Sequence, residues 1–169
     1  MNKKLTLSIS MLIILIISLG FINSAFSTNN QTETDTKISL AHHIQVYYLH
    51  NTFRCFSCNS IGELTKAAVL GGKVENPQTG EESTIAPVFK DLTDQGKLSF
   101  SEINVDNTEN HHFLADFHTR SKFPVIVEIK DGRIARYKVL KEVWKLLHGP
   151  QDKFISYVQE NVKEYSKGL

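Results

Sequence analysis

Residues 44–61 read IQVYYLHNTFRCFSCNSI, an apolar and aromatic run followed by two cysteines. Residues 44–49 are rich in β-branched and aromatic side chains and contain no breaker, which predicts a strand covered on both faces. Residues 58–70 carry apolar side chains at intervals of three and four and stop at two glycines, which predicts a helix. Cys55 and Cys58 therefore lie where a strand passes into a helix.

These two cysteines are the only ones in the 169-residue chain. A thiol at a helix N-terminus is stabilised as the thiolate by unpaired N–H groups and the helix dipole, and the thiolate is the form that attacks disulfides. Cys55 is the thiol so placed, and Arg54 would favour its thiolate further if the guanidinium folds back toward the sulfur. Cys58, one helical turn later, is close enough to form a disulfide with it. The pair is interpreted as an attacking and a resolving thiol.

The N-terminus predicts export from the cytoplasm. Lys3 and Lys4 precede an uncharged apolar run at residues 5–22, followed by small and polar residues, which is typical of a secretion signal. Cleavage after Ser27 would make residues 1–27 a signal peptide, and an uncleaved membrane tether through the apolar run is the competing interpretation. In both cases we expect a periplasmic, cell-surface or secreted domain, where a disulfide persists.

The remaining chain predicts one domain. Residues 28–39 are polar and are interpreted as a linker, and residues 40–169 have the usual size of one domain. The chain has 19 Lys and Arg against 18 Asp and Glu, which argues against nucleic acid as a partner because it requires concentrated positive charge. No glycine-rich phosphate-binding turn is present, and no cofactor is expected.

Alternating elements predict the fold class. After the first helix we expect a loop insertion at 72–87, a short helix at 88–94, a strand at 98–105, a helix at 109–118, strands at 124–129 and 134–139 joined by an Asp131-Gly132 turn, a short helix at 141–148, and a final helix that places Phe154, Val158, Val162 and Tyr165 on one side. This order predicts an α/β fold with a mixed central sheet flanked by helices.

With these elements in place, the chain resembles the thioredoxin superfamily. The resemblance rests on a strand leading into Cys-x-x-Cys, on Ile-Asn-Val-Asp at 103–106, and on Phe123-Pro124 before Val-Ile-Val and a Lys-Asp-Gly turn. More narrowly, the Tyr-Tyr-Leu-His at 47–50, the Arg-Cys-x-x-Cys pair and the Val-Trp-Lys-Leu at 143–146 are similar to a thioredoxin-fold family described as a nitrophenyl-compound nitroreductase subunit, often found beside arsenic-resistance genes. If that description is chemically meaningful, the chain would be an accessory electron carrier.

The resemblance implies a thioredoxin-like fold and an exported thiol-disulfide oxidoreductase whose partner is a disulfide-bearing protein or a small disulfide. It implies a cis peptide bond before Pro124, which would lie against the cysteines and leave the Phe123 backbone free to pair with a substrate. A trans proline that starts an edge strand is the alternative from the residues alone. Arg54 and Phe56, which flank Cys55, are expected to contact the substrate.

The chain departs from the thioredoxin pattern between and before the cysteines. The intervening dipeptide is Phe56-Ser57, neither Gly-Pro nor a pair with histidine, so the direction of electron flow stays open. No tryptophan directly precedes Cys55, so the aromatic platform usual in the superfamily is not expected there.

The acid that thioredoxins carry before the first cysteine is replaced by Leu49. We predict instead that Glu102, on the neighbouring strand, is buried beneath the sheet and accepts the proton of Cys58 through water. A solvent-facing glutamate is the alternative. His50 is a second candidate, as a proton donor or as a cation that favours the thiolate, and a histidine that merely ends the strand is its alternative.

Two other function classes remain open. Cys55 and Cys58 with His50 as a third ligand would suit a soft ion such as copper(I) or zinc, although structural zinc usually takes four protein ligands. A redox-inert binding module with the same fold is the other. The adjacent pairs His42-His43 and His111-His112 are expected to be solvated surface residues, and no metal site is assigned to them.

Overall fold

A computed structural model describes residues 42–169. The predicted signal peptide, the linker and the start of the domain at residue 40 lie outside these residues. Within them, no helix combines the length and hydropathy that a membrane crossing requires.

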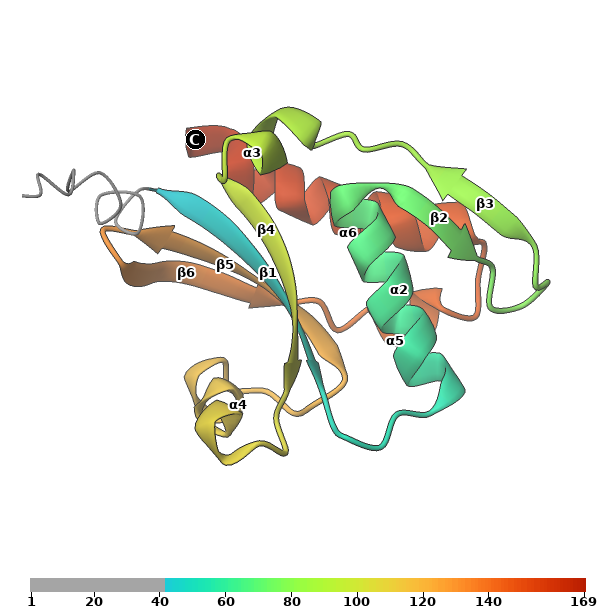
Figure 1. Ribbon diagram of the computed structural model, residues 1–169, viewed down its shortest axis with the longest axis horizontal. Helices are drawn as coiled ribbons and strands as arrows, with labels where there is room; N and C mark the ends of the chain where they lie inside the picture. The colour runs from blue at the N-terminus through green and yellow to red at the C-terminus, as the bar shows by residue number, and fades with distance from the viewer. Residues whose placement is uncertain (1–41) are drawn as a thin grey trace, which may run out of the picture. The chain divides into compact units, whose positions relative to one another are not determined.

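The described residues form a four-stranded mixed sheet (Figure 1). The order of the strands is β4-β1-β5-β6, and β1 runs parallel to β4 and antiparallel to β5. Their bounds are β1 His43–His50, β4 Leu98–Asn104, β5 Phe123–Lys130 and β6 Arg133–Val139. The predicted mixed α/β sheet is therefore confirmed.

Helices cover both faces of the sheet. Two long helices, α2 (Phe56–Leu70) and α6 (Gln151–Tyr165), pack against each other and contribute to the larger core. The short helices are α3 (Lys90–Asp94), α4 (His112–Asp116) and α5 (Val143–Leu146), with 3-10 turns at Thr108–Asn110 and Ser166–Gly168. Figure 1 shows α4 on the opposite side of the sheet from α2 and α6.

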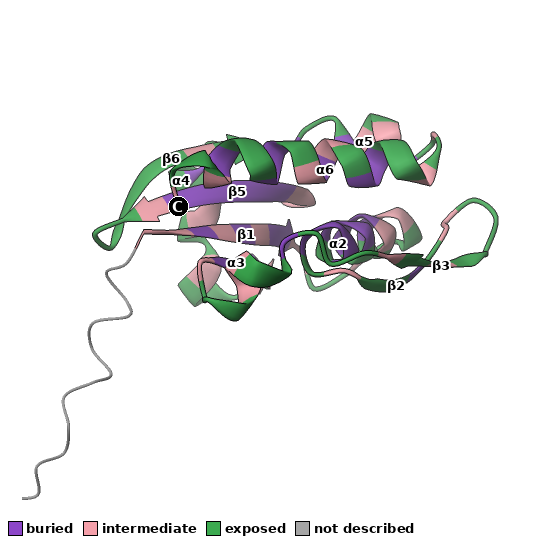
Figure 2. Ribbon diagram, turned by 90° about the horizontal axis from the view of Figure 1, so that it is seen from above, coloured by how far each residue is buried: buried purple, intermediate pink, exposed green. Residues whose placement is uncertain are grey.

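The central strand β1 divides the core because side chains alternate along a strand. Ile44, Val46 and Tyr48 pack with residues of α2 and α6, whereas Tyr47 and Leu49 pack in the second cluster with residues near α4. Figure 2 shows the neighbouring strand β5 buried along most of its length. Each fully buried aliphatic side chain contributes about 1.5–3 kcal/mol. The prediction of a first strand covered on both faces is confirmed.

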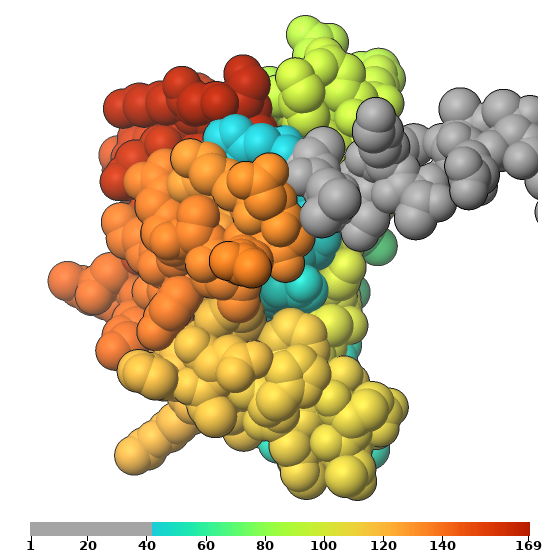
Figure 3. Space-filling view, turned by 90° about the vertical axis from the view of Figure 1, so that its left-hand side faces the viewer, coloured from blue at the N-terminus to red at the C-terminus, as the bar shows by residue number. Residues whose placement is uncertain are grey.

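The hairpin between β5 and β6 turns at Asp131-Gly132, as predicted. Both residues have positive φ, 52° and 71°, which suits a two-residue turn whose twist matches that of the strands. Figure 3 shows this hairpin, in orange, on the surface next to the α4 segment, in yellow.

The prediction of a loop at 72–87 is wrong, because this segment forms a second, two-stranded sheet. Strands β2 (Gly72–Glu75) and β3 (Glu82–Ile85) pair antiparallel. The strands are short and mostly exposed, so they carry little of the alternating apolar pattern that marks a strand. Val74 is the buried exception and joins the larger core.

The helix predicted at 109–118 is shorter than expected. It splits into the 3-10 turn at Thr108–Asn110 and the single turn of α4. His118 has a φ of 46°, a left-handed conformation that does not continue a right-handed helix. The predicted apolar residues Phe113, Leu114 and Phe117 nevertheless belong to the second core cluster.

Candidate active site

The cysteine pair lies at the N-terminus of α2. Cys55 is the N-cap residue, and its Sγ accepts a hydrogen bond from the backbone N–H of Cys58 at 3.3 Å. The two cysteines form a disulfide, with their Cα atoms 5.0 Å apart. Cys55 is exposed, whereas Cys58 is buried, with 1% of its surface accessible. An incoming thiol or disulfide can therefore reach the first sulfur more readily than the second.

Tyr48 forms a hydrogen bond with the backbone of the buried cysteine. This fully buried side chain of β1 donates a hydrogen bond from its hydroxyl to the carbonyl oxygen of Cys58 at 2.5 Å. Burial raises the pKa of Tyr48 to about 12, and the nearby Arg54 lowers it in part. The hydroxyl therefore stays protonated at neutral pH and acts as a donor. No local pattern indicates this role, because Tyr48 has the pattern of an ordinary strand residue.

Arg54 is directed toward the sheet. Its Nη1 donates to Oε2 of Glu102 at 2.6 Å, and its guanidinium carbon lies 5.4 Å from the centre of the Tyr48 ring. Its Nε is buried and has no hydrogen-bond partner among the described residues. Because the carboxylate of Glu102 compensates the positive charge of Arg54, the electrostatic effect of this guanidinium on Cys55 is reduced. A guanidinium folded back toward the sulfur was the condition for a direct effect on Cys55, and here it pairs with Glu102 instead.

Gly62, on α2, allows this arrangement. A Cβ atom at position 62 would lie 2.8 Å from two ring carbons of Tyr48 and 2.8 Å from Nη2 of Arg54. Any larger residue would force these side chains to move. A glycine inside a helical pattern carries no local signal for this close approach.

The predicted burial of Glu102 is wrong. The residue lies on β4, the edge strand of the sheet, opposite Tyr48 in the β1 register, and it is exposed. An edge strand leaves room for a long side chain to reach water, and the ion pair with Arg54 holds the carboxylate there. A role for Glu102 in proton transfer stays a prediction.

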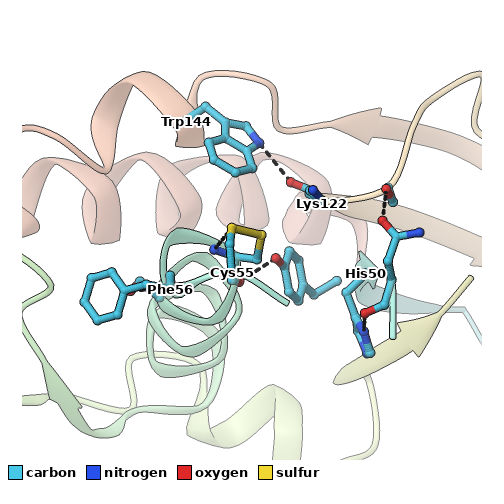
Figure 4. Close-up of a disulfide and its surroundings, with 10 residues drawn as sticks. His50, Cys55, Phe56, Lys122 and Trp144 are labelled. Carbon is cyan, nitrogen blue, oxygen red and sulfur yellow. Dashed lines mark hydrogen bonds between the residues drawn. A yellow bond between two sulfur atoms is a disulfide. The ribbon is translucent and has the colours of Figure 1, made fainter. Parts of the chain in front are cut away.

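His50 has its own contacts at the end of β1. Its Nδ1 lies 2.9 Å from the carbonyl oxygen of Asn51, and its Nε2 lies 4.0 Å from Oε2 of Glu102. Figure 4 shows His50 set apart from the disulfide. Its proposed part in proton transfer also stays a prediction.

The cis bond predicted before Pro124 is wrong, since no peptide bond of residues 42–169 is cis. The chain turns instead at Lys122, which has a φ of 73°. Pro124 then lies inside β5, opposite Tyr48, and its carbonyl accepts from the N–H of Leu140 at 2.9 Å. A proline fits here because β5 begins only one residue earlier and its pairing with β6 starts at Val125.

Trp144 holds the loop that precedes β5. Its indole N–H donates to the carbonyl oxygen of Lys122 at 3.0 Å, while the N–H of Lys122 donates to the carbonyl of Leu49 at 2.5 Å. Figure 4 shows Trp144 in the surroundings of the disulfide. An aromatic residue near the cysteines thus comes from α5, far along the chain. The Val-Trp-Lys-Leu similarity was the available signal for it.

Asn51 connects three loops at this end of the sheet. Its Nδ2 donates to Oδ1 of Asp106 at 2.7 Å, and its Oδ1 accepts from the hydroxyl of Ser121 at 2.5 Å. The backbone N–H of Thr52 donates to the other oxygen of Asp106 at 2.8 Å. These hydrogen bonds, first that from Asn51, lower the pKa of Asp106. The loop that leads to the cysteines is therefore fastened to both neighbouring loops.

Two of the four residues expected to contact a substrate, Phe56 and Phe123, differ in exposure. Phe56, directly after Cys55, is 65% exposed. Phe123 is half-buried, packs against the core shared by α2 and α6, and pairs in register with Leu49.

The histidines do not assemble a metal site in the described part of the chain. No group of three or more His, Cys, Asp or Glu side chains is arranged to hold an ion there. His111 and His112 are exposed, as expected. His42 differs from expectation, because it is half-buried and its Nε2 lies 2.7 Å from Oε1 of the buried Glu128.

Comparison with known proteins gives no family assignment. No protein-family model and no curated protein matches this chain. A functional proposal therefore depends on the cysteine pair and its surroundings.

Proposed function

We propose that this protein is an exported thiol-disulfide oxidoreductase with a thioredoxin-like fold. The observation that carries the proposal is the asymmetric cysteine pair: an exposed Cys55 at a helix N-cap and a buried Cys58 bonded to it. A helix N-terminus favours the thiolate, and exposure gives a partner access to it. The order of strands and helices around the pair supports the thioredoxin-like assignment.

In the reductive direction, the Cys55 thiolate attacks one sulfur of a partner disulfide, and the other partner sulfur leaves as a thiolate. Cys58 then loses its proton and attacks the Cys55 sulfur, which forms the intramolecular disulfide and releases the second partner thiolate. The partner gains two electrons and the protein loses two. Run in reverse, the same steps oxidise a partner dithiol.

The positions of the two sulfurs support this division of labour. The Cys58 N–H donates to Cys55 Sγ, and this bond would also stabilise a Cys55 thiolate once the disulfide is reduced. The bond from Tyr48 to the Cys58 carbonyl anchors the first turn of α2. The loop at Phe123 and Pro124 would then contact the partner chain.

The test is reduction of insulin disulfides by the full chain in the presence of a thiol donor. We expect turnover with the native protein, background rates with Cys55→Ser, and a trapped mixed disulfide with Cys58→Ser. Ser156→Ala, at an exposed serine of α6, is the matched control and should keep activity. Background rates for both the native protein and Cys55→Ser would favour a redox-inert binding module instead.

The direction of electron flow follows from a second measurement. Equilibration of the Cys55–Cys58 couple with glutathione gives its reduction potential. A potential close to that of thioredoxin, roughly −270 mV, indicates a reductase, and one close to roughly −120 mV indicates a disulfide-forming catalyst.

A further inference from the structure

The surface on one side of the disulfide is positively charged. A hollow of about 450 Å³ is lined by Asn51, Trp144 and residues 120–123, and an adjoining hollow of about 400 Å³ is lined by His118, Thr119, Arg120, Phe123 and Lys141. Together they present Arg120, Lys122 and Lys141 and no carboxylate. None of these three cations forms an ion pair within residues 42–169.

The carboxylate of Asp106 lies next to this surface, and it forms no ion pair with the three cations. It bonds to the lining residue Asn51, and its two oxygens accept from Asn51 Nδ2 and from the N–H of Thr52. These contacts hold the carboxylate in the loop after β4. Because the three cations form no ion pair within residues 42–169, they are available to an external anion.

A hollow on the other side of the disulfide carries two carboxylates and no cation, although Glu63 also lines a neighbouring hollow with Lys66 and Lys73. The first hollow, of about 270 Å³, is lined by Phe56, Asn59, Ser60, Glu63, Glu75 and Pro77. Its two carboxylates, Glu63 and Glu75, form no ion pair in the described part of the protein. Figure 4 shows Phe56 and Lys122 on opposite sides of the disulfide.

Two exposed aromatic residues lie within two positions of Cys55 in the sequence. Phe53 is 84% exposed and Phe56 is 65% exposed, although large apolar side chains are usually covered. An extended polypeptide segment carries apolar and charged side chains on both sides of its cysteine, which suits exposed rings and charged hollows around one reactive sulfur.

We propose that the substrate is a polypeptide disulfide whose segment carries carboxylates on one side of its cysteine and cations on the other. The carboxylates lie against Arg120, Lys122 and Lys141, and the cations lie against Glu63 and Glu75. Apolar residues beside the substrate cysteine contact Phe53 and Phe56. This inference rests on the proposed function, since it names the substrate class of the same site.

The test compares two peptide disulfides of identical composition and zero net charge. One carries two glutamates before its cysteine and two lysines after it, and the other has these charges exchanged. We expect the reduced full chain to react about tenfold faster with one than with the other at low salt, because two or three surface charge pairs change sign. The ratio should approach one at roughly 0.5 M salt, where screening is strong.

Variants test which residues set this preference. Arg120→Glu with Lys141→Glu should lower or reverse the ratio, whereas Arg120→Lys with Lys141→Arg should keep it, because the charges are retained. Lys153→Glu with Lys167→Glu is the matched control, since both lysines are exposed and lie outside the three hollows. The control should leave the ratio unchanged.

Each contrary result has a distinct meaning. Equal rates for the two peptides at low salt, both well above Cys55→Ser, overturn the charge preference and leave the proposed function standing. Faster reaction with oxidised glutathione than with either peptide overturns the polypeptide substrate. Rates at the Cys55→Ser background for every disulfide reject the proposed function itself.

Discussion

Arg54 and Glu102 form an ion pair of 2.6 Å that joins the loop before the cysteines to the edge strand of the sheet. This contact involves two residues to which the sequence suggested separate tasks, one at Cys55 and one at Cys58. Each side chain compensates the charge of the other. The pair therefore sets how much positive charge remains near the exposed thiol.

Replacement of Glu102 by Gln should release the charge of Arg54. We expect alkylation of reduced Cys55 at neutral pH to become about two- to fivefold faster, because the uncompensated guanidinium favours the thiolate. Stability should fall by about 1 kcal/mol or less, since the pair is partly exposed. Glu82→Gln, which breaks the exposed pair with Lys73, is the control and should not change the rate. An unchanged rate of disulfide release in Glu102→Gln would reject a proton-accepting role.

Gly62→Ala should be destabilising although alanine is the better helix former. The new methyl would lie 2.8 Å from the Tyr48 ring and from Arg54, which overpacks this contact. We expect a loss of about 1–3 kcal/mol in the free energy of unfolding by urea. In Gly149→Ala the nearest atom is 3.5 Å away, so that variant should stay within about 0.5 kcal/mol of the native protein.

Tyr48→Phe should weaken the first turn of α2. The Cys58 carbonyl loses its buried donor, which costs about 1–3 kcal/mol. The pKa of Tyr48 is raised from 10.0 to about 12, so the folded state retains a proton that the unfolded state releases. Stability from this tyrosine is complete below about pH 10 and is lost as the pH rises toward 12. At alkaline pH, the free energy of unfolding should therefore fall less steeply with pH in Tyr48→Phe than in the native protein. An identical slope would contradict this account.

Glu128 should control stability in acid. Hydrogen bonds from Lys130, Arg136 and His42 lower its pKa from 4.5 to about 2, despite burial. Because the folded pKa is depressed, its contribution is complete above about pH 4.5 and is lost as the pH falls toward 2. Glu128→Gln should lower the free energy of unfolding by about 1–3 kcal/mol at neutral pH. It should also make this free energy depend less on pH in acid. Glu160→Gln, an exposed glutamate of α6, should leave that pH dependence unaltered.

Trp144→Phe should loosen the loop before β5. The variant keeps an aromatic ring but loses the N–H that donates to the Lys122 carbonyl. We expect KM for peptide disulfides to rise severalfold with a smaller change in kcat, because the loop no longer holds one position. Steady-state kinetics measure both constants. Trp144→Leu should show the same KM increase, whereas a selective fall in kcat would argue against a positioning role.

Much of this domain follows from local sequence. The unbroken apolar and aromatic run of β1, the apolar stripe of α6 and the Asp131-Gly132 turn each predicted an element that the structure contains. Cys55 at the helix N-terminus follows from the same kind of local pattern. Such features depend on neighbouring residues and on backbone preferences, which a single sequence carries directly.

Contacts between distant segments were decided by the tertiary structure. Glu102 became an ion-pair partner because its strand lies at the sheet edge beside β1, and Trp144 reached the loop before β5 from a helix later in the chain. The left-handed turn at Lys122 replaced the expected cis bond before Pro124. The sequence by itself determined the cysteine pair and the elements that hold it. Its surroundings depended on which strands and loops become neighbours, because hydrogen bonds and ion pairs act only between groups that the fold brings within reach.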